Sequence, residues 1–97
     1  MSDWPFDQPP NCAVFTLRQI AYEGAPILQV THDAEDHGWQ FLTLAEADPE
    51  SAVLLSFGSI VTLDPALVEL ADLPPGWRAW RESVRHPWRR EPHPRLT

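Results

Sequence analysis

The chain has 97 residues, a length that suits one domain with a single hydrophobic core. Hydrophobic residues make up 43% of it, which argues against wholesale disorder, and the single cysteine, Cys12, excludes an internal disulfide. No apolar run reaches the roughly 18 residues that a membrane-spanning helix needs, and the acidic, proline-broken start does not resemble a signal peptide. We therefore expect a cytoplasmic protein without membrane contact, with Cys12 as a buried, unreactive thiol.

Charge is distributed unevenly along the chain, whose net value is −7. Residues 19–77 contain ten acidic side chains and no arginine or lysine, whereas residues 78–97 contain six arginines and two glutamates. An acidic body repels nucleic acid and anionic lipid, and it accelerates the encounter with a cationic partner. An acidic surface that only maintains solubility is the alternative, and the charge pattern alone leaves both open.

The first part of the chain predicts an arm and a strand. Residues 1–11 are expected to form an irregular arm whose Trp4 and Phe6 insert into a groove of the domain. Residues 12–17 are β-branched and aromatic, which favours a strand. Residues 22–26 supply a turn, in which Gly24 can adopt a positive φ.

A β-hairpin is the clearest structural prediction in the chain. Residues 27–32 and 38–43 both follow a strand pattern, and a polar, glycine-ended segment connects them. Trp39 and Phe41 fall on one face of the second strand, so we expect them at the centre of the core, on the side of the sheet that faces the helices.

The middle of the chain mixes strand and helix patterns. Residues 45–50 indicate an acidic loop or a single helical turn, residues 53–56 a further strand, and residues 57–61 either a strand or a short helix. Asp64 is a good helix N-cap with Pro65 at the first helical position. An apolar stripe at helical spacing then follows, made of Leu67, Leu70 and Ala71.

The segment 72–81 concentrates two prolines, a glycine, two tryptophans and two arginines. The prolines end the preceding helix, and we expect a second short helix after them that carries Trp77, Trp80 and Val84 on one face. This helix would close the domain by seating Trp77 or Trp80 on the sheet, so both join Trp39 and Phe41 in the predicted core.

These elements predict one α+β domain, in which a small antiparallel sheet packs against short helices. The expected boundaries are an N-terminal arm over residues 1–11, the domain over residues 12–88, and a Pro/Arg-rich tail over residues 89–97.

Two groups of residues contain side chains that could bind a metal ion or nucleic acid. His32, Asp33, Asp36 and His37 are metal-ligand types, but polar residues are also what a hairpin turn needs, and we favour the solvated turn. Trp77, Trp80 and Trp88 alternate with arginines as on a single-strand nucleic-acid surface, yet the acidic body favours burial of the rings, with the arginines stacked on them or paired with acids. No nucleophile elbow or phosphate loop is present, so we expect no enzyme, no cofactor, no metal and no nucleic-acid partner.

Several motifs together resemble a known family. They are the segment Asp36-His37-Gly38-Trp39-Gln40-Phe41-Leu42, the segment Leu63-Asp64-Pro65-Ala66-Leu67, the segment 73–81 and Trp88. Over residues 12–91 the chain is similar to the small bacterial DUF2185 family, also called the Imm33-like immunity domain. That resemblance implies a protein that binds and neutralises a bacterial toxin, and it brings no catalytic residues.

The sequence therefore predicts a small acidic non-enzymatic binding protein whose partner is a cationic protein such as a toxin. The expected contact surface consists of acids in two loops and one helix cap: Asp33, Glu35, Asp36, Glu46, Asp48 and Asp64. The alternative is a small regulatory or structural module that acts as a homodimer, joined through an edge strand or exposed tryptophans. Both a monomer and a homodimer remain open.

Overall fold

A computed structural model describes residues 4–46 and 48–93 of the chain. Its strands form one six-stranded sheet in the order β4-β1-β3-β2-β5-β6. The strands are β1 (Ala13–Leu17), β2 (Gln29–His32), β3 (Trp39–Leu42), β4 (Ala52–Ser56), β5 (Trp77–Trp80) and β6 (Arg89–Pro92). The helical segments are α1 (Arg18–Glu23), α2 (Phe57–Leu63) and the 3-10 turns η1 (Pro49–Ser51) and η2 (Pro65–Leu70).

The predicted α+β class is confirmed, with one difference in the sheet. All neighbouring strands are antiparallel except β1 and β3, which run parallel. The sheet is mixed because β1 pairs not with β2, which follows it in the chain, but with β3 and β4. No helix within the described ranges is long and apolar enough to cross a bilayer.

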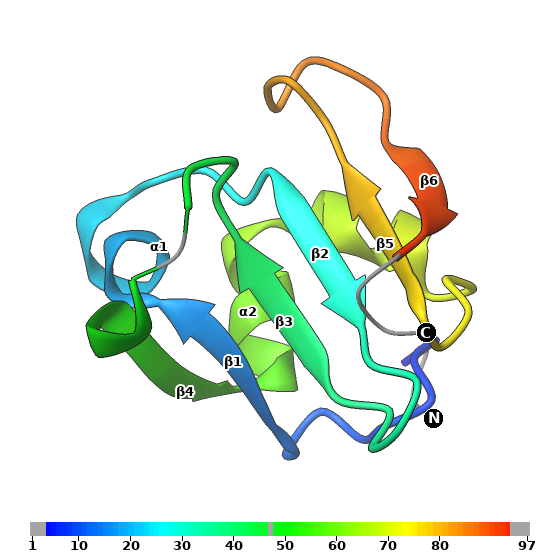
Figure 1. Cartoon of the computed structure of the whole chain (residues 1–97). Helices are drawn as coiled ribbons and strands as arrows, with labels where there is room; N and C mark the ends of the chain where they lie inside the picture. The colour runs from blue at the N-terminus through cyan, green and yellow to red at the C-terminus, as the bar shows by residue number, and fades with distance from the viewer. Residues whose placement is uncertain (1–3, 47, 94–97) are drawn as a thin grey trace.

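One face of the sheet carries the core. Figure 1 shows α2 behind the sheet, and the inward side chains of the strands pack against it. Trp39 and Phe41 are both buried at the centre, as predicted. Phe6 of the arm is also buried and Trp4 packs beside it, which confirms that the arm inserts its aromatic rings into the domain. Cys12 was expected to be buried and is half-buried.

The predicted hairpin is confirmed as β2 and β3. Val30 pairs with Phe41 and His32 with Trp39, so the buried side chains of both strands share one face. The turn is closed by the Asp33 amide, which donates to the Gly38 carbonyl over 2.8 Å.

The structure resolves the ambiguous segments in favour of helix. α1 was not predicted, because the sequence left residues 18–21 unassigned and indicated a turn over residues 22–26. The helix ends at Gly24, whose φ of 78° is the positive value expected there. Residues 57–61 belong to α2, which Ser56 caps by accepting a hydrogen bond from the Ser59 amide. Asp64 caps the next segment as predicted, but that segment, η2, is a 3-10 helix.

The predicted helix after Gly76 is wrong. Gly76 has a φ of 86° and lies in a turn, after which residues 77–80 form β5 and pair with β2. Since side chains alternate along a strand, Trp77 and Trp80 point to opposite faces. Trp77 packs against the core, whereas Trp80 is half-buried on the other face and Ala79 takes the buried position. Val84 lies beyond the strand and is 58% exposed.

The sheet also continues past the predicted domain boundary. β6 lies inside the segment assigned to the tail, and it pairs antiparallel with β5 along its whole length. The Arg78 guanidinium approaches Glu91 at 3.2 Å across these two strands. The His93 amide also donates to the Gly76 carbonyl over 2.8 Å, so the domain extends at least to His93. Residues 94–97 of the predicted tail lie outside the described residues.

Candidate functional site: the uncovered face of the sheet

Within residues 4–46 and 48–93, no helix covers the sheet face opposite α2 and η2, which we call the uncovered face; it is the face toward the viewer in Figure 1. Phe15 on β1 and Leu54 on β4 project from it, with 51% and 56% of their surfaces exposed. They are direct cross-strand partners. The same strand alternation that buries Val14 and Thr16 in the core thus places Phe15 in solvent.

The pairing geometry brings Phe15 and Leu54 close together. The Phe57 amide donates to the Cys12 carbonyl over 2.8 Å, so residues 12 and 57 form a hydrogen-bonded pair of the antiparallel ladder. Such pairs alternate with non-hydrogen-bonded ones, in which side chains approach more closely. Phe15 and Leu54, three positions further along the ladder, belong to the second kind. They form one contiguous apolar patch.

Two shallow hollows flank Phe15 on this face. One of about 330 Å³ lies toward η1 and includes Leu42, Asp48 and Pro49 in its lining. The other, of about 260 Å³, lies toward the β2–β3 turn and includes Asp33 and Asp36. Phe15 and Gln40 line both hollows. We call Phe15, Gln40, Leu42 and Leu54 the Phe15 face.

The predicted acidic residues do not form one surface. β3 leads from the β2–β3 turn to the loop before η1, so Asp33, Glu35 and Asp36 lie at one end of the sheet while Glu46 and Asp48 lie at the other (Figure 1). Glu35 and Glu46 are exposed. The acids therefore stand at the two ends of the Phe15 face.

Three of these carboxylates also build the turns that hold them. One oxygen of Asp33 accepts from the Glu35 amide, one of Asp36 from the Gly38 amide, and one of Asp48 from the Glu50 amide, over 2.7, 2.7 and 3.0 Å. Short polar side chains commonly stabilise turns in this way. Each carboxylate keeps its second oxygen for a further contact.

Asp64 lies elsewhere and has a different role. Its carboxylate forms an ion pair with Arg81, whose side chain is only 3% exposed. The Arg81 guanidinium also donates twice to the Ile27 carbonyl, and the Trp88 ring stacks over it at 4.1 Å. A buried charge needs such a partner, so Asp64 compensates Arg81 inside the domain.

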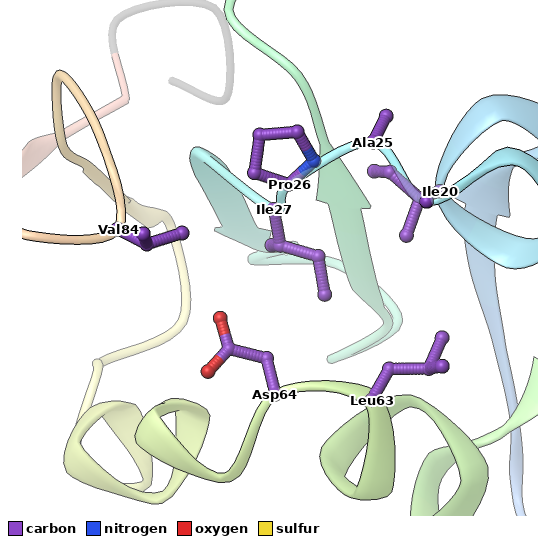
Figure 2. A pocket seen from close by; sticks show the side chains of 8 residues that line it. Ile20, Ala25, Pro26, Ile27, Leu63, Asp64 and Val84 are labelled. Carbon is purple, nitrogen blue, oxygen red and sulfur yellow. The ribbon is translucent and has the colours of Figure 1, made fainter.

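Figure 2 shows a third hollow, of about 350 Å³, beside this ion pair. Asp64 projects into it from the end of α2, and the other labelled side chains, such as Ile20, Ile27 and Val84, are apolar. Because Arg81 already binds the Asp64 carboxylate, this hollow offers mainly an apolar wall.

The residues considered for metal binding do not converge. His32 is 2% exposed, and its Nδ1 lies 2.7 Å from the Leu73 carbonyl, to which it donates. Its ring stacks on Trp39 at 4.0 Å, whereas the ring of His37 lies 6.1 Å away. Throughout residues 4–46 and 48–93, no three His, Cys, Asp or Glu side chains are grouped closely enough to hold a metal ion.

The carboxylate of the arm residue Asp7 contacts His32 instead. One Asp7 oxygen accepts from the Trp39 indole over 3.0 Å, and the other lies 3.2 Å from His32 Nε2. This contact fixes the arm to β2 and β3. Sequence reasoning missed it because residues 7 and 32 are far apart in the chain and His32 was considered only together with its neighbours in the hairpin turn.

The arginines near the C-terminal strands contact rings and acids, as expected. Arg89 stacks over Trp80 at 5.2 Å, and Arg90 binds Asp72 over 2.6 Å. The Arg90 guanidinium holds the pKa of the Asp72 carboxyl below its usual range, first through the hydrogen bond and then through its charge.

No known protein family, no curated protein and no solved structure matches the chain. The resemblance to the DUF2185 family stays a prediction.

Proposed function

We propose that this protein is a non-enzymatic binding protein that uses the Phe15 face to bind a basic protein. The observation that carries the proposal is the exposed Phe15–Leu54 pair on the uncovered face, with carboxylates at both ends of that face. The partner surface that fits it has an apolar centre and arginine or lysine residues around that centre.

The apolar pair supports a recognition role because of its context. Single exposed hydrophobic residues are normal, but a contiguous apolar patch with a polar rim is typical of an interaction site. Aromatic side chains near the centre of such a patch often contribute most of the binding free energy. Phe15 occupies this central position, since it lines both hollows.

The carboxylates support a basic partner. Asp33 and Asp36 at one end and Asp48 at the other each keep one oxygen that the turn does not use. With a net charge of −7, the chain attracts a cationic partner at a distance, which accelerates association more than it strengthens the final complex.

The resemblance to the immunity domain suggests which basic protein this is. A domain of that kind binds and neutralises a bacterial toxin, a role that needs a binding face and no catalytic groups. A cationic toxin is therefore the proposed partner. A gene for a secreted toxin beside the gene for this protein would support that assignment.

Replacing Phe15 by aspartate tests the apolar centre. Partner proteins are captured from the host on the immobilised wild-type chain, purified, and measured again against Phe15→Asp by calorimetry. We expect affinity to fall at least about thirtyfold, the loss typical of a central aromatic contact. Tyr22→Asp is the matched control, because Tyr22 is an exposed aromatic residue on α1. Equal affinity of both variants and the wild type would contradict the proposal.

Removing two charges tests the acidic rim. Asp33→Asn with Asp36→Asn keeps a side-chain oxygen for each turn hydrogen bond but removes the charge. We expect slower association and a weaker dependence of its rate on salt, whereas Glu23→Gln with Glu69→Gln removes two exposed charges elsewhere and changes the rate less. Identical effects of the two pairs would show that only net charge matters.

A further inference from the structure

The two edges of the sheet differ in their protection against pairing with another strand. β6 carries Arg89, Arg90, Glu91 and Pro92, and charged residues and proline are the features that block edge-to-edge pairing. β4, at the other edge, has the sequence Ala-Val-Leu-Leu-Ser without charge or proline. The chain has 14 acidic residues, but none of them, and no arginine, lies between Ala52 and Leu63.

The ladder between β1 and β4 determines which backbone groups of β4 point outward. Residues 12 and 57 form a hydrogen-bonded pair, so Leu55 and Val53 also direct their backbone groups to β1. The N–H and C=O of Leu54 therefore point toward the free edge. Leu54 lies at the middle of the five-residue strand.

We propose that two copies of this chain pair antiparallel through β4, with Leu54 opposite Leu54 of the second copy. This register has two-fold symmetry, so the same residue supplies a donor and an acceptor on each side. The outward N–H and C=O of each Leu54 then bind their counterparts. The result is one continuous sheet with six strands from each copy.

Charge does not oppose a second copy at this edge. Neither β4 nor α2 contains a charged residue, so the seam places no like charges opposite each other. Glu50 precedes β4. Because the two strands run antiparallel, the Glu50 side chains of the two copies lie beyond opposite ends of the seam. A five-residue seam is about 16 Å long, which exceeds the screening length of about 8 Å at physiological salt. A net charge of −7 therefore does not prevent this contact.

Pairing would join the two Phe15 faces. Leu54 and Phe15 project from the same face of the sheet, so the two apolar pairs form one stripe across the seam. This consequence depends on the proposed function, but the seam itself does not.

Opposite charges at position 54 test the register. We expect the wild type to be dimeric by light scattering across a dilution series, and Leu54→Lys and Leu54→Glu each to weaken dimerisation by at least about tenfold, since like charges then face each other. Mixing the two variants should restore a dimer that contains one copy of each. Leu63→Lys and Leu63→Glu, at an exposed leucine on α2, are the matched controls and should remain dimeric.

A backbone change provides a second test. Leu54→Pro removes only an N–H that points away from β1, and proline is tolerated at such edge positions. We expect Leu54→Pro to be a monomer whose unfolding temperature is close to that of the dissociated Leu54→Lys variant, whereas Leu54→Ala keeps the N–H and the dimer. A monomeric wild type, or a dimer that persists in both Leu54→Lys and Leu54→Pro, would overturn the proposal. Phe15→Asp lies off the seam and should stay dimeric even where it loses its partner.

Discussion

The ion pair between Asp64 and Arg81 is the most constrained charge contact among the described residues. Arg81 is nearly completely buried, held by Asp64, the Ile27 carbonyl and the Trp88 ring. It connects the end of α2 to the segment just before β2 and to the chain after β5. Since a buried cation without its anion is costly, the fold depends on Asp64 more than on the exposed acids.

Asp64→Asn should lower the free energy of unfolding by about 3 kcal/mol, because it leaves the buried guanidinium without a counter-charge. Asparagine still offers an oxygen to the Ala66 amide, so the helix cap is kept. Urea denaturation measures the loss. Asp72→Asn is the control, since Asp72 also pairs with an arginine but is exposed, and it should leave stability unchanged within error. Equal losses for both variants would refute a special role of Asp64.

For single residues, the sequence predicted those roles that depend on the local pattern. Trp39 and Phe41 were predicted in the core because they alternate on a strand, and Asp64 was predicted as a cap because Pro65 follows it. The pairing of Asp64 with Arg81 was not predictable, because it depends on how α2 and β5 come together. The contact of Asp7 with His32 was not predictable either, because it depends on how the N-terminal arm packs against β2 and β3.

At the scale of elements, β5 shows how a short segment can mislead. Trp77 and Trp80 are three residues apart, which fits one helical face, but over four residues the same pattern also fits a strand. Tryptophan favours strands, and β2 offers an open edge with which residues 77–80 pair. Tertiary pairing therefore decided the outcome. The β2–β3 hairpin was predictable because its alternation and its turn agree.

The opposite orientations of the two tryptophans lead to different costs of truncation. Trp77→Ala should lower the free energy of unfolding by about 2 kcal/mol, roughly half the cost for a fully buried ring. Trp80→Ala should cost about 1 kcal/mol, since it loses mainly the Arg89 stacking contact. Chemical denaturation of both variants measures the difference. Equal and large losses would favour the helical arrangement, in which both rings face the core.

For the whole molecule, the order of charges in the sequence did not predict their arrangement in space. Asp33 and Asp48 were expected on one acidic surface, but the strand between them carries the chain to the opposite end of the sheet. The class of fold followed from the pattern of elements. The uncovered face and the unprotected edge followed only from strand order, which local sequence does not contain.

β4 lies at the edge of the sheet and pairs only with β1, which has a consequence for the rate and order of folding. β2 and β3 are joined by residues 33–38 and can pair locally, whereas β1 meets β4 only after the chain between them has closed a long loop. We expect Phe41→Leu to slow folding and Leu55→Ala, on β4, mainly to accelerate unfolding, both measured by stopped-flow fluorescence. A large decrease in the folding rate of Leu55→Ala would contradict this order. If β4 joins last, the edge that pairs two copies forms only in the finished monomer, and folding should be independent of protein concentration.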